Sequence, residues 1–211
     1  MGGTMKTIVF QGDSITDGER NRNNELYMGS GYVTMTAGRI AVDHPGEYCF
    51  FNRGISGNRS VDMYARIKKD VLNLQPDILT VLIGVNDVWH EFGSQNGVSA
   101  PKFKKVLKLF LEEIREELPD LQIFLLEPFV LPGTATEEHL DEFTKEVLLR
   151  ATACKEIATE MGIPFIPLQQ KLEDLAAITG ADYVLHDGVH PTCAGHTVIS
   201  RALYDALAAV L

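Results

Sequence analysis

The sequence lacks the features that would send a protein to a membrane or to nucleic acid. No apolar run approaches the roughly 20 residues that a membrane-spanning helix needs. Positive charge is scarce, since 19 Lys and Arg stand against 29 Asp and Glu and give a formal net charge of −10. A chain this acidic is a poor candidate for binding a phosphate backbone. We therefore expect neither nucleic acid nor a membrane as a partner, and a neutral or cationic substrate.

Cysteine and secretion signals are also scarce. The three cysteines, Cys49, Cys154 and Cys193, are far apart and odd in number, so no disulfide framework uses them all and no pair has metal spacing. The first residues run directly into an apolar segment, without the long hydrophobic stretch and small-residue cleavage site of a signal peptide. These absences predict a cytoplasmic protein whose thiols are kept reduced. Either Met1 or Met5 can be the natural start.

What is present is the composition of an ordinary globular domain. Hydrophobic residues make up 45% of the 211 residues and charged residues 23%, both typical of a soluble fold. The length fits one domain, and no linker, repeat or low-complexity stretch interrupts it. We predict a single domain over residues 1–211.

Short apolar segments alternate with longer amphipathic ones along the chain. The short segments predict strands at 7–11, 47–52, 77–83, 121–126 and 163–166, the last at an edge because of its prolines. The longer segments predict helices at 32–42, 61–74, 102–118, 137–161 and 194–211. Strands that alternate with helices indicate βαβ units and a parallel sheet covered on both faces. The predicted fold class is therefore α/β, doubly wound.

Ligands of such a sheet bind beyond the carboxyl ends of the strands, so the loops that follow the strands are the places to look for chemistry. Ser14 lies in the segment Gly-Asp-Ser-Ile-Thr-Asp directly after the first predicted strand. A serine in a tight strand-to-helix turn can present its hydroxyl and its own N–H to one site, as an acyl-transfer nucleophile requires. A Ser or Asp helix cap is the plainer interpretation of this segment taken alone.

The second and third predicted strands are each followed by a polar turn. Gly57 lies in the glycine-rich segment 52–58, where a backbone N–H is open to a ligand. Asn86 lies in the loop 84–89, and its amide is of a kind that stabilises an oxyanion. Either segment alone is typical of an ordinary turn.

The fourth segment, His-Asp-Gly-Val-His-Pro at 186–191, precedes the last predicted helix. Asp187 and His190 are three residues apart in a loop, where the carboxylate can hold one tautomer of the imidazole. His186, Asp187 and His190 also make an alternative, a metal site, although no fourth ligand accompanies them.

Together the four segments supply a nucleophile, a base, an orienting acid and oxyanion donors. A non-catalytic glycan-binding module has no need of Ser14, Asp187 and His190 together. The chain contains no G-x-S-x-G nucleophile elbow, which counts against the α/β-hydrolase fold.

The four segments resemble the conserved blocks of the SGNH, or GDSL, hydrolases, in the same order and over nearly the whole chain. The resemblance implies a three-layer α/β/α domain with a five-stranded parallel sheet, of flavodoxin-like type. It also implies a Ser14, Asp187 and His190 triad, an oxyanion hole from Ser14, Gly57 and Asn86, and neither cofactor nor metal. One small departure is Val85, where the third block often has a second glycine.

Finer features resemble the acetylxylan-esterase type within that family; they lie in segments 12–17, 29–33, 52–58, 86–89 and 190–196. This implies an oligomeric acetylesterase acting on xylo-oligosaccharide esters through an acetyl-serine. The alternative is a lipid esterase, lysophospholipase or acyl thioesterase, which would need an extended apolar groove. Trp89, the only tryptophan, is either a platform for a sugar ring or a core residue.

Overall fold

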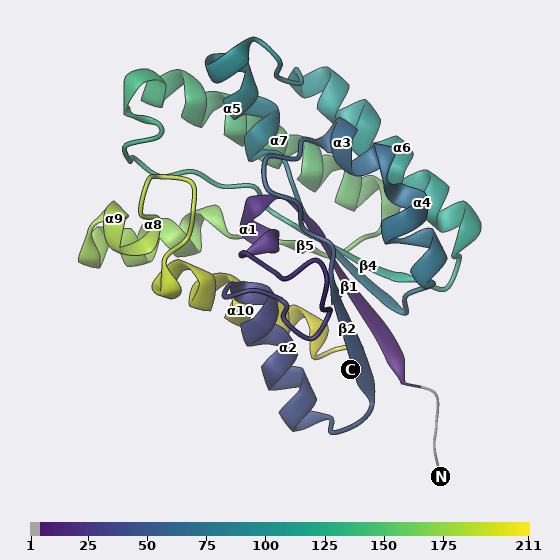
Figure 1. Ribbon diagram of the computed structural model, residues 1–211. Coiled ribbons are helices and arrows are strands. Elements are labelled where there is room, and N and C mark those ends of the chain that lie inside the picture. The colour runs from purple at the N-terminus through teal and green to yellow at the C-terminus, as the bar shows by residue number, and fades with distance from the viewer. Residues whose placement is uncertain (1–4) are drawn as a thin grey trace.

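The computed structural model describes residues 5–211, so a start at Met1 lies outside the described residues. Its centre is a five-stranded sheet in the order β2-β1-β3-β4-β5, with every neighbouring pair parallel (Figure 1). The strands are β1 (Lys6–Gly12), β2 (Tyr48–Asn52), β3 (Ile78–Leu82), β4 (Gln122–Leu126) and β5 (Phe165–Ile166). All five lie within the predicted segments or within one residue of them, and β5 is at the edge as expected.

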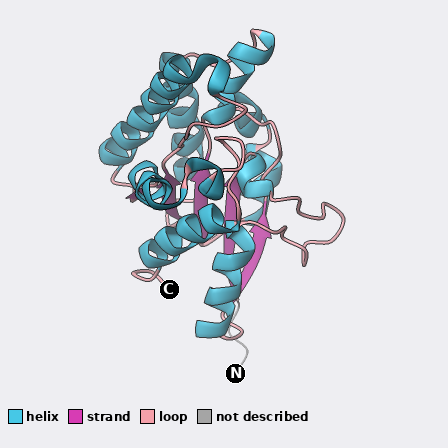
Figure 2. Cartoon of the chain, turned by 90° about the vertical axis from the view of Figure 1, so that its left-hand side faces the viewer, coloured by secondary structure: helices cyan, strands magenta, loops and turns pink. Residues whose placement is uncertain are grey.

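Helices cover both faces of the sheet, so the α/β class with a parallel sheet is confirmed (Figures 1 and 2). One face carries α2 (Tyr32–Asp43), α8 (Gln169–Thr179), α9 (Ala181–Val184) and α10 (Cys193–Leu207). The other carries α3 (Ser60–Ala65), α4 (Ile67–Asp70), the 3₁₀ turn η1 (Leu72–Leu74), α6 (Ala100–Glu117) and much of α7 (Leu140–Met161). The short α1 (Ser14–Asp17), α5 (Val85–Ser94) and the 3₁₀ turn η2 (Glu137–His139) lie in the connections.

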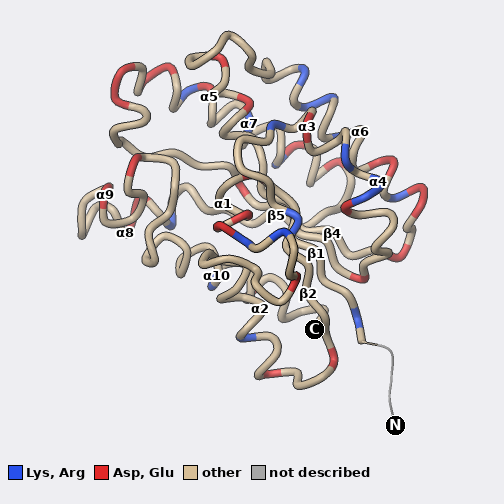
Figure 3. Tube along the Cα trace, viewed as in Figure 1, with Lys and Arg blue, Asp and Glu red and all other residues tan. Residues whose placement is uncertain are grey.

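Two hydrophobic cores result from the alternation of side chains along each strand. In β1, Ile8 and Phe10 join the core beneath α2 and α10, whereas Val9 joins the core beneath α6. A parallel sheet buried on both faces needs such continuous apolar strands, since neither face can be polar. The outer face of α6 is charged, and its Lys108 pairs with Glu160 of α7 where basic and acidic positions intermingle (Figure 3).

The prediction of one continuous helix at 61–74 is wrong. It is broken into α3, α4 and η1, with Arg66 in a non-helical conformation between α3 and α4. The Arg66 guanidinium donates to the carbonyl oxygen of Gly12 at 3.0 Å and to Asn58 Oδ1 at 2.8 Å. Periodicity favours a continuous helix, but these tertiary hydrogen bonds outweigh it.

Other helix boundaries also differ from the prediction. The prediction of a loop at 84–89 is wrong, because α5 begins within this segment. Helices α8 and α9 fall in a stretch for which the periodicity predicted no helix. The long fourth helix begins at Leu140 after η2, and it ends at Gly162 in a left-handed conformation, as a C-terminal glycine predicts. The last helix ends at Leu207 rather than at the chain end.

All three cysteines are free thiols, in agreement with the lack of a disulfide framework. Cys154 is buried in the core beneath α6, and this burial raises the pKa of its thiol above the ordinary value. Within the described residues, no helix is both long and apolar enough to cross a membrane.

Candidate active site

The predicted site residues meet at the carboxyl edge of the sheet, between β1 and β3. The order β2-β1-β3 reverses direction at β1, so the connections after β1 and β3 leave toward opposite faces and open a crevice between them. Ser14 begins α1 directly after β1, and Asn86 lies in the first turn of α5 directly after β3. The fold therefore brings together the first and third predicted segments.

Asp13 fixes the turn that presents Ser14. Its Oδ1 atom accepts a hydrogen bond from the Ile15 N–H at 3.0 Å, which is the N-terminal cap of α1. Asn52 at the end of β2 holds the other end of α1 by donating to the Thr16 carbonyl oxygen at 2.7 Å. Ser14 itself is half-buried, with its hydroxyl on the crevice side.

A continuous hydrogen-bond chain links the predicted nucleophile, base and acid. Ser14 Oγ lies 3.0 Å from His190 Nε2, and His190 Nδ1 lies 2.7 Å from Asp187 Oδ2. An ionised Asp187 is only an acceptor, so His190 carries its ring proton on Nδ1 and offers the Nε2 lone pair to the serine hydroxyl. The three side chains come from opposite ends of the sequence, 176 residues apart in the case of Ser14 and His190.

Asp187 is held in its ionised form. Burial by itself would raise its pKa, but three hydrogen bonds outweigh burial and lower the pKa below the ordinary value. The donors are the His190 ring, the His190 backbone N–H at 2.7 Å and the Val189 backbone N–H at 2.9 Å. A carboxylate in this position stabilises an imidazolium when His190 takes up a proton.

Hydrogen-bond donors converge on the same crevice. Gly57 has a φ of +81°, a conformation that glycine adopts without strain, and its N–H has no acceptor among residues 5–211. Asn86 is 5% exposed, and its Nδ2 donates to the Asn58 carbonyl oxygen at 3.2 Å, which leaves its second N–H for a ligand. Asp17 Oδ2 accepts from the Ser56 N–H at 3.0 Å and ties the Gly57 turn to α1.

A hollow of about 540 Å³ opens over these groups. Its lining comprises Ser14, Ser56, Gly57, Asn86, Trp89, His90, Gly93, Ser94 and His190. The Trp89 ring packs against Phe143 with centroids 6.3 Å apart, and Trp89 also lines the hollow next to His190.

Sequence reasoning missed several residues that position the site. Arg66 donates to the carbonyl oxygens of Gly12 at the end of β1 and of Arg53 just after β2, and no pattern in the sequence marks it. The sequence assigned His196 no role of its own, yet its Nδ1 accepts from the Tyr32 N–H at 3.1 Å beside the crevice. Burial and then the neighbouring His190 lower the pKa of His196 to about 4, so this ring stays neutral near pH 7.

The buried carboxyl of Asp13 should make the stability of the fold depend on pH. Burial and the nearby Asp87 raise the pKa of Asp13 to about 7 from an ordinary value of 3.8, although the Ile15 N–H acts in the opposite direction. Between those two pH values the unfolded chain has lost the proton and the folded chain still holds it. Stability contributed by this neutral carboxyl is therefore present at low pH and is lost as the pH rises toward 7.

We expect Asp13→Asn to flatten that loss, because the amide oxygen still accepts from Ile15 and the variant has no proton to lose. From pH 4 to pH 8, the unfolding free energy of the variant should rise relative to that of wild type by on the order of a few kcal/mol. Urea unfolding across this range measures it. Asp182→Asn, at an exposed position of α9, is the control. Parallel curves for wild type and Asp13→Asn would contradict the raised pKa.

A serine hydrogen-bonded to a histidine at the switch point of a doubly wound sheet is an arrangement typical of one class of protein, the ester hydrolases. Comparison with known proteins agrees with this class. Residues 10–198 match the model of the GDSL-like lipase/acylhydrolase family, and the chain belongs to that family. It is accordingly an ester hydrolase.

Three relatives show how closely the chain matches. A structure from Parabacteroides merdae described as a GDSL-like lipase is 33% identical, covers 98% of both chains and superimposes with a TM-score of 0.91. The crystal structure of Axe2, an acetylxylan esterase from Geobacillus stearothermophilus, is 29% identical over 97% of this chain and 94% of its own, with a TM-score of 0.85. A curated acetylxylan esterase from the same organism is 29% identical over 95% of this chain and 93% of its own. Solved variants of Axe2 at a serine, an aspartate and a histidine are named catalytic mutants of that enzyme.

Proposed function

We propose that this ester hydrolase removes acetyl groups from carbohydrates, with xylo-oligosaccharide esters as the substrate class. The observation that carries the proposal is the hydrogen-bond chain from Asp187 through His190 to Ser14, which ends at a crevice with free N–H donors. The likeness to acetylxylan esterases supports the choice of acyl group and alcohol.

The proposed mechanism assigns one role to each group. Ser14 Oγ attacks the ester carbonyl carbon while His190 Nε2 accepts the hydroxyl proton. The oxyanion is stabilised by the N–H groups of Ser14 and Gly57 and by the Asn86 side chain. Asp187 stabilises the imidazolium, and His190 then returns the proton to the departing sugar oxygen.

The second half of the reaction repeats these roles with water. The acetyl group is now bound to Ser14, and His190 takes a proton from a water molecule as that water attacks the acetyl carbon. Collapse of the second oxyanion releases acetate and returns the proton to Ser14. The described groups suffice for every proton transfer in this sequence.

The surroundings of Ser14 offer polar groups to the alcohol part of a sugar ester. On one side lies the 540 Å³ hollow, with hydroxyl, imidazole and tryptophan groups in its lining. On the other lies a hollow of about 370 Å³, lined in part by Glu19, Ser30 and His186. Such polar groups beside an aromatic face are of the kind that recognises a sugar, and the ester series below decides between a sugar ester and a longer acyl chain.

The test is a matched series of esters from acetyl to octanoyl, assayed beside acetate release from acetylated xylo-oligosaccharides. We expect kcat/KM to be highest for acetyl esters and the oligosaccharides to release acetate. Preference for octanoyl esters with no release from the sugars would replace the proposal with a lipid esterase or acyl thioesterase.

A further inference from the structure

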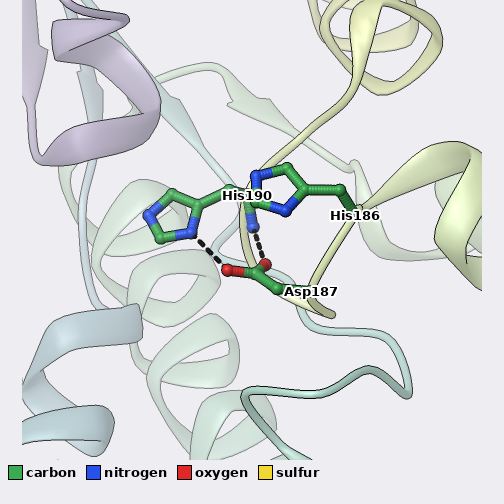
Figure 4. Close-up of side chains that lie close together, drawn as sticks. All are labelled: His186, Asp187 and His190. Carbon is green, nitrogen blue, oxygen red and sulfur yellow. Dashed lines mark hydrogen bonds and ion pairs between the residues drawn. The ribbon is translucent and has the colours of Figure 1, made fainter.

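A group of metal-ligating side chains shares the loop that holds His190. One nitrogen of His186, one nitrogen of His190 and one carboxylate oxygen of Asp187 lie within 4.8 Å of one another (Figure 4). The two imidazole rings are nearly parallel, at 14°, with centroids 5.7 Å apart. His186 takes no part in the proposed proton transfers, and its side chain is exposed.

The backbone keeps these three residues together. Leu185 and Pro191 form an antiparallel bridge, and within it the His186 N–H donates to the His190 carbonyl oxygen at 3.0 Å. Gly188 closes the turn with a φ of +94°, and a Cβ there would lie 2.5 Å from the Leu131 carbonyl oxygen. The proximity of the two histidines is therefore a property of the turn and does not depend on side-chain rotamers alone.

Two imidazoles and one carboxylate are a donor set that Zn²⁺ prefers. Bonds of about 2.0–2.2 Å in a tetrahedron place neighbouring donor atoms about 3.3–3.5 Å apart. The Asp187 Oδ2 to His190 Nδ1 distance of 2.7 Å needs only a small expansion, and rotation of the His186 ring supplies the third ligand. We propose that His186, Asp187 and His190 form an inhibitory site for a divalent transition metal, with Zn²⁺ as the best fit, and that a water molecule completes its coordination.

Metal binding at this site removes the base of the proposed reaction. A metal between Asp187 and His190 takes the Nδ1 position, so the neutral ring carries its proton on Nε2, the atom 3.0 Å from Ser14 Oγ. That nitrogen then has no lone pair for the serine proton. A metal bound at Nε2 instead occupies the same lone pair directly. The metal is thus an inhibitor and supplies no chemistry to the ester reaction.

The loss of activity rests on the proposed function, whereas metal binding does not, so the two are measured separately. Binding is followed with Co²⁺ through the visible absorbance bands of a tetrahedral site, in the Ser14→Ala protein as well as in wild type. Inhibition is followed by titrating the acetyl-ester assay with Zn²⁺ and then adding EDTA.

The deciding variant is His186→Ala. The matched control is His44→Ala, because His44 follows α2 and precedes β2, at the edge of the sheet opposite the site. Each protein is compared with its own metal-free rate, because His186 also lines the smaller hollow beside Ser14. We expect His186→Ala to need at least about tenfold more Zn²⁺ for half-inhibition, since even outer groups of metal sites contribute 10–100-fold to affinity. Zn²⁺ should inhibit wild type and His44→Ala equally and reversibly. Co²⁺ bands that are present in wild type and lost in His186→Ala support the site even in the absence of esterase activity. Absence of the bands, or bands and inhibition unchanged in His186→Ala, would overturn it.

Discussion

Ser14→Ala should lower kcat by about 10⁴–10⁶-fold and leave the fold intact. The hydroxyl is the only group in the proposed mechanism that forms a covalent bond to the substrate, and alanine offers no replacement nucleophile. The fold should tolerate the change because the cap of α1 comes from Asp13 and the Ser14 side chain is half-buried at the crevice. The residual rate would come from the oxyanion donors acting on bound water.

Steady-state kinetics with an acetyl ester and thermal unfolding of the same preparation measure the two parts of this expectation. Ser94→Ala is the matched control, because Ser94 lines the same hollow but its Oγ donates to the His90 carbonyl oxygen at 3.0 Å, outside the His190 chain. Its kcat should change only a few-fold. Wild-type protein quenched during turnover should carry an acetyl group on the peptide that contains Ser14. Turnover of Ser14→Ala comparable to that of Ser94→Ala would show that another group is the nucleophile.

The strands were accessible from the sequence because each strand is short, apolar and bounded by turn residues. Burial on both faces of a parallel sheet leaves little choice of residue, so Ile8, Val9 and Phe10 indicate a strand without any knowledge of their neighbours. Helix ends were less accessible. Arg66 interrupts its helix through hydrogen bonds to Gly12 and Asn58, and such long-range partners leave no periodic signal.

The residues that gather at the candidate site were predictable from the sequence, whereas the residues that hold them in place were less so. A serine, an amide, a carboxylate and a histidine each follow a turn signal, and the parallel sheet places such turns at one edge. Asn86 was expected in a loop but lies in the first turn of α5, which fixes its amide more firmly than a loop would. The roles of Asp17 and Asn52 depend on hydrogen bonds to backbone groups of other loops, and composition gives no hint of these. Self-association is a prediction that the resemblance alone carries.

The second large effect is expected from Asp187→Asn, which should lower kcat by about 10⁴-fold. The variant keeps the shape of the side chain, and its Oδ1 still accepts from the backbone N–H groups of Val189 and His190. Those two bonds force the amide Nδ2 toward His190 Nδ1, where it donates a proton instead of accepting one. The imidazole must then carry its own proton on Nε2, facing Ser14 Oγ.

This outcome separates the role of Asp187 in setting the tautomer from its role as a charge. Asp182→Asn removes the same charge from an exposed position of α9 and should leave kcat within a few-fold of wild type, because a solvated charge is strongly screened. Nitrogen NMR of His190 should report protonation at Nδ1 in wild type and at Nε2 in Asp187→Asn. A variant with the Nε2 tautomer and nearly full activity would remove the Ser14–His190 proton transfer from the mechanism. A slow variant that keeps the Nδ1 tautomer would assign the loss to the missing charge beside the imidazolium. The Nε2 tautomer together with the large fall in kcat is the result that the 2.7 Å contact between Asp187 and His190 predicts.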